Sequence, residues 1–349
     1  MTMIDKSKPV MLTGATGYVA GALVEKFLAE GFTIHAPIRN PDNKEKTQYL
    51  DALAERLEGT IRYYKADLLD YGSYDEAMDG CELVFHTASP FSLNVNDPQK
   101  ELVDPALKGT QNVLESANKC PSVKRIVLTS SVAAIYGDNA DLEDIEEEAF
   151  TEDHWNTSSS LKHQPYAYSK TLAEKEAWRL AALQDRWDLV VINPSLVIGP
   201  AVNPYARSES FNIVRQIGDG NMRLGAPAYS LGVVDVRDLS EAHYRAGFYP
   251  EAEGRHIISH KTEDFLSLAT YLQDEFGGSH HLPKKHSPKF LVWLFGPLKG
   301  ISRKMVSRNL AYTWKADNTK SKEKLDIHYR PVKESISDMF RQMVQYKRL

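Results

Sequence analysis

The stretch HQPYAYSK, residues 163–170, holds two tyrosines and a lysine that could take part in proton transfer. Tyr166 and Lys170 are four residues apart, so they share one face of a helix, whereas Tyr168 points elsewhere. A tyrosine hydroxyl can act as a general acid toward a carbonyl oxygen that becomes an alkoxide. Its ordinary pKa is about 10, and a neighbouring ammonium favours the phenolate. The spacing therefore predicts that Lys170 lowers the pKa of Tyr166.

A second pair with the same spacing occurs near the C-terminus, at Tyr329 and Lys333. Pro331 lies between them and discourages the helix that would align the two side chains. The first pair instead opens a segment of good helix formers, KTLAEKEAW. Only the first pair is therefore a candidate for chemistry.

A glycine-containing turn near the N-terminus, TGATGYVAG, places Gly14, Gly17 and Ala20 at three-residue intervals. It follows an apolar strand and precedes an amphipathic helix, which is the setting of a dinucleotide-binding turn. Glycine lets a pyrophosphate approach the free N–H groups at the helix N-terminus. A plain tight turn is the alternative. No Gly-Lys-Ser/Thr follows, so a triphosphate-binding loop is not supported.

The next expected strand ends at Arg39, with Lys44 and Lys46 close behind and no carboxylate before Asp42. An NAD-specific site tends to place a carboxylate here for the ribose 2′-hydroxyl, whereas a guanidinium can hold a 2′-phosphate. NADP(H) is therefore favoured. The alternative is that Arg39 only solvates a strand end.

The first half of the chain alternates apolar strands with amphipathic helices, which is typical of a parallel sheet covered on both faces. The expected strands are PVMLT, FTIHAPIR, IRYYKADL, ELVFHTAS, KRIVLTSS and DLVVINPSLVIGP, and the expected helices include YVAGALVEKFLAEG, GTQNVLESANKC and PYAYSKTLAEKEAWRLAALQD. After about residue 200 the pattern loosens. Residues 231–258 are expected to supply a strand and a helix that return to the main sheet.

Composition excludes several function classes. A net charge of −5 and a pI near 6.1 give no basic stripe for nucleic acid. The two cysteines, Cys81 and Cys120, have no metal-type spacing. We expect the acidic run 141–153 to be a solvated loop, and the histidines of 280–286 to lie in an exposed loop without metal.

No membrane partner and a cytoplasmic location are expected, because the start of the chain lacks the apolar core of a signal peptide. The longest apolar run, FLVWLF at 290–295, is far shorter than the ~20 residues of a spanning helix. It is predicted to be a buried helix or a wall of a substrate pocket.

Together the glycine turn, the serine pair that ends KRIVLTSS, and Tyr-x-x-x-Lys resemble the extended short-chain dehydrogenases/reductases. VFHTASPF, YSKTLAEKEAW and PSLVIGP resemble the branch with dihydroflavonol reductase, cinnamoyl-CoA reductase and NADPH-dependent methylglyoxal or aldehyde reductases. The resemblance implies a Rossmann-type doubly wound α/β fold with a smaller, mostly C-terminal substrate-binding lobe. Residues 1–195, with 231–258 returning, would form the NADP-binding domain, and 196–230 with 259–349 the second lobe.

Residue roles are also carried over from the resemblance. The implied catalytic residues are Ser131, Tyr166 and Lys170. The implied cofactor-binding residues are Thr13, Gly14, Thr16, Gly17, Tyr18, Val19, Arg39, Lys46, Asp67, Leu68, Thr87, Ala88, Ser89, Thr129, Tyr166, Lys170, Pro194 and Val197. The candidates for the substrate pocket are Phe91, Ser131, Tyr136, Tyr166, Leu196 and Tyr205, for which core packing is the alternative.

Tyr136 stands where the plant flavonoid reductases carry an asparagine that binds the substrate, which casts doubt on a flavonoid substrate. The resemblance favours an NADPH-dependent reductase of aldehydes or ketones, with Tyr166 as proton donor and a small carbonyl compound as partner. A nucleotide-sugar epimerase or dehydratase and a non-catalytic NADP(H) sensor stay open, as does the choice between monomer and homodimer.

Overall fold

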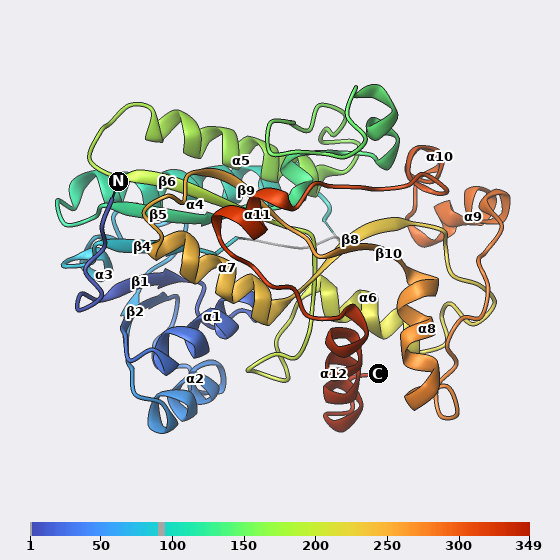
Figure 1. The fold of residues 1–349 in the computed structure, drawn as a ribbon, viewed down its shortest axis with the longest axis horizontal. Coiled ribbons are helices and arrows are strands. Elements are labelled where there is room, and N and C mark those ends of the chain that lie inside the picture. Colours follow the sequence, from blue (N-terminus) through green and yellow to red (C-terminus); the bar gives the residue numbers. More distant parts are fainter. Residues whose placement is uncertain (1, 90–94) are drawn as a thin grey trace.

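The computed structural model describes residues 2–89 and 95–349, and a sheet of seven parallel strands forms its centre (Figure 1). The spatial order is β3-β2-β1-β4-β5-β6-β9, which reverses direction between β1 and β4. The strands are β1 (Val10–Thr13), β2 (Thr33–Ile38), β3 (Thr60–Lys65), β4 (Leu83–His86), β5 (Arg125–Thr129), β6 (Asp188–Pro194) and β9 (Gly254–Ile258). Ligands of such sheets bind at the carboxyl ends of the strands where the order reverses. The predicted doubly wound α/β fold is confirmed.

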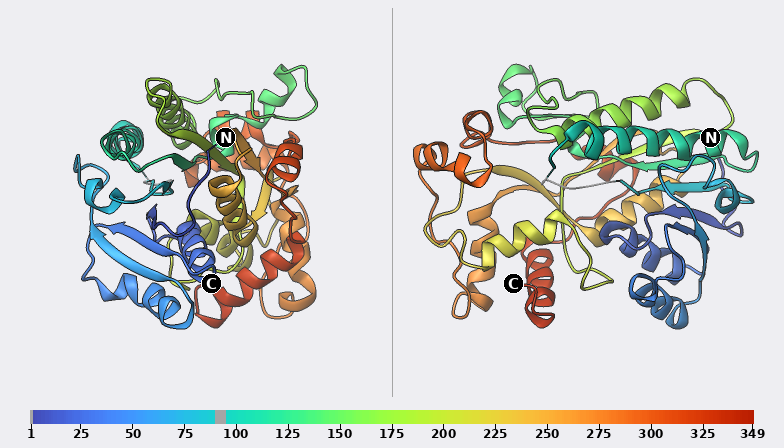
Figure 2. Two further views of the ribbon diagram at one scale, coloured as in Figure 1. Left: turned by 60° about the vertical axis from the view of Figure 1, so that its left-hand side comes forward. Right: turned by 180° about the vertical axis from the view of Figure 1, so that it is seen from behind.

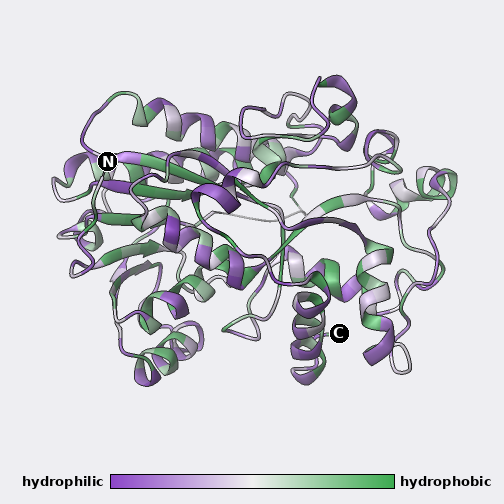
Figure 3. Cartoon of the chain, viewed as in Figure 1, coloured by the Kyte–Doolittle hydropathy of each residue, from purple (hydrophilic) through white to green (hydrophobic). Residues whose placement is uncertain are grey.

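Helices cover both faces of this sheet. One face carries α1 (Tyr18–Ala29) and α7 (Val236–Phe248), and the other carries α3 (Asp75–Met78), α4 (Asp104–Lys119) and α5 (Pro165–Ala181). Along β1, Val10 and Leu12 pack into the first core while Met11 packs into the second, as the alternation of a strand requires. The central strands are therefore buried on both sides, and in Figure 3 they are coloured mostly as hydrophobic.

A second, three-stranded sheet lies beside the first, in the order β10-β8-β7. It consists of β7 (Leu196–Ile198), β8 (Ser230–Asp235) and β10 (Lys261–Asp264). The single strand predicted for DLVVINPSLVIGP is therefore wrong: it divides into β6 and β7, which belong to different sheets. Pro194 ends β6 and has no N–H to donate to the ladder. The Ser195 N–H makes a last hydrogen bond to the Ile258 carbonyl oxygen at 3.1 Å, and the chain then leaves the main sheet.

The strand expected to return to the main sheet after residue 230 is also placed differently. β8 joins the second sheet, because it pairs antiparallel with β10 and parallel with β7. Helix α7 and strand β9 do return, and β9 pairs with β6. The division into a cofactor-binding domain and a substrate-binding lobe stays a prediction.

Helix α2 (Lys44–Arg56) lies on the same face as α1, because its Leu50 and Leu53 pack into the same core. The remaining helices (Figure 2) are α6 (Glu209–Gly218), α8 (Phe265–Phe276), α9 (Lys289–Phe295), α10 (Arg303–Asn309), α11 (Thr319–Lys324) and α12 (Val332–Gln345), with short 3-10 or π turns at η1 (Gln99–Val103), η2 (Val132–Ala134), η3 (Asn139–Asp144) and η4 (Gly296–Lys299). Across residues 2–89 and 95–349, no helix is both long enough and apolar enough to cross a bilayer.

The prediction of a buried helix at FLVWLF is wrong. The segment forms α9, none of whose residues is buried, and Phe290 is 66% exposed. Its main contacts are with η4 and α10, so neither sheet covers it. Periodicity within the segment could not reveal this, because burial depends on what the rest of the chain packs against it.

Candidate active site

The first turn of α5 is anchored to a buried carboxylate. Asp138 is fully buried, and its oxygens lie 2.8 Å from His163 Nε2 and accept hydrogen bonds from Gln164 Nε2 at 3.0 Å and Asn309 Nδ2 at 2.6 Å. Burial alone would raise the pKa of Asp138, but these hydrogen bonds outweigh burial and lower it. Gln164 adopts φ 55° and Pro165 begins the helix. The carboxylate therefore fixes the start of the helix that carries Tyr166.

Tyr166 contacts the predicted serine. Ser131 follows β5 and caps η2, where its Oγ accepts a hydrogen bond from the Ala133 N–H at 3.1 Å. The Tyr166 hydroxyl hydrogen-bonds the Ser131 side chain. Burial raises the pKa of Tyr166 to about 12, and the Ser131 bond opposes that rise. Burial dominates the shift in the chain alone, and the lowering of this pKa by Lys170 stays a prediction.

Lys170 lies one turn further along α5 and is only 8% exposed. Burial lowers its pKa to about 8, and the carboxylate of Glu174 opposes that change. Lys170 therefore keeps most of its positive charge at pH 7, at a position enclosed by the protein. Tyr168 has no side-chain hydrogen bond within residues 2–89 and 95–349, which separates it from this arrangement.

Glu174 connects the strands that surround the lysine. It is fully buried and accepts hydrogen bonds from Ser130 Oγ, from Asn193 Nδ2 at 2.8 Å and from Arg255 Nε at 2.6 Å. Of the serine pair, Ser130 thus serves this carboxylate while Ser131 contacts Tyr166. The sequence analysis missed Glu174 and its partners, although Glu174 lies four residues beyond Lys170 on the same helix face. That spacing could have identified it.

The glycine turn fits a diphosphate. Gly14 has φ +72°, and a Cβ there would lie 3.0 Å from the Ala88 backbone, so both conformation and space require glycine. Gly17 caps α1 without a side-chain hydrogen bond, which leaves the N-terminal amides of this helix available to an anion. Thr13 is fully buried, and its Oγ1 accepts hydrogen bonds from the amides of Thr87 at 3.1 Å and Ala88 at 3.0 Å. It therefore holds the end of β4 against the turn.

The next residues of the turn differ in what their side chains can do. Thr16 and Val19 are partly exposed beside Gly17. Tyr18 is buried, and its hydroxyl donates to the Gly199 carbonyl oxygen at 2.7 Å. Any contact of Tyr18 with a cofactor would therefore come from its backbone.

Arg39 follows β2, is exposed, and forms no ion pair with any residue in the described ranges. Lys46 is likewise exposed and unpaired there, whereas Lys44 pairs with Asp51 at 3.4 Å. Burial raises the pKa of Tyr74, and the positive charge of Arg39 opposes that rise. The guanidinium of Arg39 is therefore near this buried tyrosine. An available guanidinium at this strand end fits a 2′-phosphate.

A pocket opens at the carboxyl ends of β4 and β5, between α4 and α5. Among its lining residues are five predicted ones, Leu68, Ala88, Ser89, Thr129 and Lys170. The structure thus brings residues from four separate segments to the point where the strand order reverses.

Two histidines near this pocket were not predicted: His86 lines it, and His243 contacts the lining residue Thr129. The Thr129 hydroxyl is 2.7 Å from His243 Nε2, whose other ring nitrogen donates to the Leu239 carbonyl oxygen at 2.8 Å. Burial lowers the pKa of His243 to about 4, so Nε2 accepts from Thr129. His86 is buried against Thr13 Oγ1 at 3.0 Å, and burial followed by the charge of Lys170 lowers its pKa to about 3. Both rings are neutral and serve to position strands.

Asp67 closes its own turn, because its Oδ1 accepts a hydrogen bond from the Leu69 N–H at 2.9 Å. The loop is held from α4 by Asn112, whose Nδ2 donates to the carbonyl oxygens of Asp67, Leu68 and Asp70. The Asp67 side chain is therefore used to form a turn, which is an alternative to the implied contact with a cofactor. Nothing in the sequence singled out Asn112, since its partners come from a loop about forty residues away.

The candidates for the substrate pocket separate widely. Phe91 lies outside the described residues. Tyr136 stacks on Phe150, with ring centroids 5.1 Å apart, and belongs to a core cluster that includes Trp314. Tyr205 is 56% exposed and meets Tyr346 edge-on at 5.7 Å, so no described contact links it to the Ser131–Tyr166 pair.

The last three candidates lie where β6 gives way to β7. Pro194 is buried at the end of β6, while Leu196 and Val197 lie on β7 and pack against the main core. These residues come directly after Asn193 of β6, whose Nδ2 donates a hydrogen bond to the Ser131 carbonyl oxygen at 3.1 Å. The hydrogen bond holds this part of the chain beside Ser131.

No group of three or more potential metal ligands occurs among residues 2–89 and 95–349. In the acidic run, Asp141 and Asp144 pair with Arg308. His286 lies 2.7 Å from Asp264.

The model of the NAD dependent epimerase/dehydratase family matches residues 10–258. The chain belongs to this family. The matched residues include the glycine turn and the Tyr166–Lys170 pair, and they end at the last residue of β9. The predicted family is confirmed, and at this level so is the prediction of a nicotinamide-dependent oxidoreductase.

Curated relatives of this member are plant reductases. It is 40% identical to cinnamoyl-CoA reductase CAD2 of Medicago truncatula over 82% of this chain and 86% of that protein. It is 31% identical to the bifunctional dihydroflavonol 4-reductase/flavanone 4-reductase of Pyrus communis, covering 81% and 80% respectively. Among solved structures, yeast methylglyoxal/isovaleraldehyde reductase Gre2 complexed with NADPH aligns with a TM-score of 0.77 at 26% identity, covering 98% and 100% of the two chains.

Proposed function

We propose that this chain is an NADPH-dependent reductase of aldehydes or ketones. The observation that carries the proposal is the hydrogen bond between Tyr166 and Ser131, with the buried Lys170 one helical turn away and a pocket beside it. When bound, the reduced nicotinamide would supply a hydride to the carbonyl carbon. The residues of the chain then have to manage the charge that develops on the carbonyl oxygen.

Ser131 and Tyr166 can both donate hydrogen bonds to that oxygen, which stabilises the developing alkoxide. Tyr166 then transfers its phenolic proton to the oxygen as the general acid. A pKa of about 12 in the chain alone means that Tyr166 is protonated at neutral pH, as a proton donor must be. The positive charge of Lys170 would favour the phenolate that remains, and by the resemblance its ammonium would also hold the nicotinamide ribose.

The substrate class rests on the relatives. Cinnamoyl-CoA reductase, dihydroflavonol reductase and methylglyoxal/isovaleraldehyde reductase are all named for carbonyl compounds. Tyr136 packs in an aromatic cluster with Phe150, so the doubt about a flavonoid substrate rests on its identity at this position rather than on its packing. A small aldehyde or ketone in a cytoplasmic setting is the function that these observations favour.

The experiment follows NADPH absorbance with a panel of aromatic and aliphatic aldehydes and ketones. We expect steady oxidation of NADPH with at least one carbonyl compound. Conversion of a UDP-sugar without net consumption of cofactor would indicate an epimerase. Tight NADP(H) binding with no oxidation by any carbonyl would indicate a sensor.

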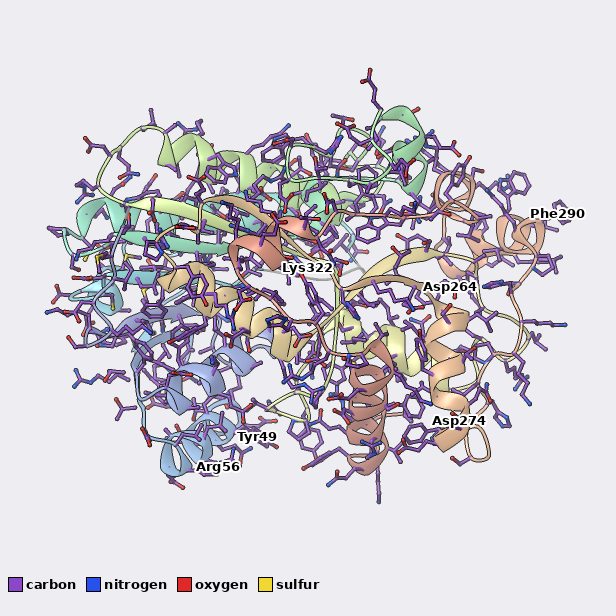
Figure 4. The ribbon with its side chains drawn as sticks, viewed as in Figure 1. Tyr49, Arg56, Asp264, Asp274, Phe290 and Lys322 are labelled. Atoms are coloured by element: carbon purple, nitrogen blue, oxygen red, sulfur yellow. The ribbon has the colours of Figure 1, made fainter. Side chains whose placement is uncertain are left out.

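Cofactor preference is proposed to depend on Arg39 and, nearby, Lys46. Both are exposed and unpaired within the described residues, so they are free to meet a 2′-phosphate. Arg39→Ala should weaken NADPH binding roughly tenfold or more while changing NADH binding little, since charge-assisted bonds contribute about 1.5–3 kcal/mol. Arg56→Ala is the matched control, because Arg56 is an exposed arginine at the far end of α2 (Figure 4). Equal losses for both cofactors would refute the assignment.

A further inference from the structure

Helix α9 and turn η4 carry the densest exposed apolar surface in the described part of the chain. Five large apolar side chains lie within nine consecutive positions: Phe290 is 66% exposed, Leu291 46%, Leu294 40%, Phe295 55% and Leu298 84%. The other exposed large apolar residues occur singly or in smaller groups, such as Tyr205 with Tyr346. A concentrated apolar patch of this kind marks an interaction surface, whereas single exposed residues do not.

A second segment extends the patch. Leu224 is 82% exposed, and the loop that carries it pairs with the chain just before α9. The Ala226 N–H donates to the Lys285 carbonyl oxygen at 3.0 Å, and the Ser287 N–H donates to the Ala226 carbonyl oxygen at 2.8 Å. Two separate parts of the sequence therefore present apolar side chains at the same end of the molecule.

The charged residues in the segment that carries this patch are all basic. Residues 276–316 contain eight lysine or arginine residues and no aspartate or glutamate, although the whole chain has a net charge of −5. Lys284, Lys285, Lys299 and Lys304 are exposed, and none of them forms an ion pair with a residue in 2–89 or 95–349. The apolar side chains are thus bordered by uncompensated positive charge.

The patch lies at one end of the molecule, and the basic surface covers only part of α10. α9 and α10 lie together at the end of the molecule opposite the N-terminal strands (Figures 1 and 2), and Phe290 is drawn at its outer edge (Figure 4). Arg303 stacks over the Trp293 ring at 4.5 Å. Arg308, by contrast, is neutralised by Asp141 at 2.9 Å and Asp144 at 3.6 Å, so the side of α10 near η3 does not belong to the basic surface.

We infer that the surface formed by Leu224, α9 and η4 binds the headgroup region of an anionic lipid bilayer. Aromatic and leucine side chains beside lysine and arginine are the composition of segments that lie in a membrane interface. Lysines that lie next to the membrane surface are attracted to anionic lipid headgroups. The same charge disfavours a symmetric dimer through α9, because two copies would bring like charges together. This inference replaces the expectation of no membrane partner.

The test measures binding of the full chain to sedimented vesicles. One set is phosphatidylcholine alone, and the other contains about 30% phosphatidylserine, which gives the surface a negative potential. We expect binding to the anionic vesicles at about 0.1 M salt, weak binding to the neutral ones, and weaker binding at about 0.5 M salt, where the charges are screened. Equal binding to both vesicle types, or to neither, would overturn the inference.

Two double variants separate the charged and apolar contributions. Lys284→Glu with Lys299→Glu and, separately, Leu294→Ser with Leu298→Ser should each reduce binding to anionic vesicles by about tenfold or more. The matched controls are Lys8→Glu with Lys322→Glu, and Met3→Ser with Leu183→Ser, which change exposed residues in other parts of the chain; Lys322 is labelled in Figure 4. The controls should keep full binding, and all four should keep the thermal unfolding profile of the parent chain.

Two further results would point to other occupants. If the chain is a dimer in solution and only the apolar double variant makes it monomeric without changing vesicle binding, the patch joins two copies. If a polyglutamate peptide binds as tightly as anionic vesicles and the apolar variant binds both normally, the surface is an acidic-peptide site. Either result would overturn the bilayer inference.

Discussion

Tyr166–Lys170 and Tyr329–Lys333 have the same spacing and similar tyrosine environments. Each tyrosine hydrogen-bonds a serine hydroxyl, Ser131 in one case and Ser321 at 2.7 Å in the other, and burial raises both tyrosine pKa values to about 12. The lysines differ. Lys170 is enclosed, whereas the Lys333 side chain is 57% exposed and pairs with Asp274 at 2.9 Å. The first pair differs in that both of its residues lie on one helix, α5, and in that its lysine is a buried cation that lines a pocket.

The largest difference is expected when each tyrosine loses its hydroxyl. Tyr166→Phe removes the proposed proton donor and should lower kcat for carbonyl reduction by about 10²–10⁴-fold. Tyr329→Phe should leave kcat within about twofold, because surface and packing changes outside a site are usually small. Initial rates of NADPH oxidation at saturating carbonyl substrate measure both. Equal losses of kcat in the two variants would contradict a role for Tyr166 as the proton donor.

A similar contrast applies to two acidic residues on α5. Glu174→Gln leaves Arg255 buried without its carboxylate and should lower the free energy of unfolding by about 3–5 kcal/mol. Glu176→Gln is the control, since its partner Arg179 is 57% exposed and such pairs contribute at most about 1 kcal/mol. Chemical denaturation measures both values. A loss for Glu174→Gln no larger than the control's would contradict the structural role described for this carboxylate.

The two lysines should also differ in how they link stability to pH. Burial lowers the pKa of Lys170 in the folded chain to about 8, from an ordinary value of 10.5. Between these values the unfolded chain binds more protons than the folded one, so Lys170 makes the free energy of unfolding rise with pH, by up to about 3 kcal/mol. Lys170→Met should lose that rise, and Lys333→Met should keep it.

Denaturation of the parent chain and both variants at pH 7 and near pH 10.5 isolates the effect, because the other titrating groups are shared. The free energy of unfolding of the parent should rise relative to that of Lys170→Met as the pH increases. A constant difference between them across this range would show that the folded chain does not depress the pKa of Lys170.

Much of the main sheet was predictable, because its strands are short, apolar and separated by amphipathic helices. β1, the glycine turn and α1 follow from local pattern alone, and so does the shared face of Tyr166 and Lys170. The break between β6 and β7 was not predicted, since VVINPSLVI is apolar on both sides of Pro194. The sheet to which β8 belongs depends on pairing with β10, which lies about thirty residues further along.

The site was predicted at its reacting groups and missed at its supports. Asn112 and His243 act through partners that are distant in sequence, so only the folded chain reveals them, whereas the spacing of Glu174 from Lys170 could have identified it. Tyr136 and Tyr205 show the converse limit, since an aromatic residue has the same sequence pattern whether it lines a pocket, fills a core or lies on the surface. The exposure of α9 was equally invisible to a reading of its apolar residues.

The central claim is that Tyr166 donates a proton to a carbonyl oxygen while hydride arrives at the carbonyl carbon. NADPH carrying deuterium on the transferred position of the nicotinamide ring tests it most directly, with the product alcohol examined by mass spectrometry and NMR. We predict one deuterium on the carbinol carbon with the parent chain and, in the same reaction time, almost none with Tyr166→Phe. Deuterium retained entirely in the cofactor, or transferred equally well by Tyr166→Phe, would contradict the account.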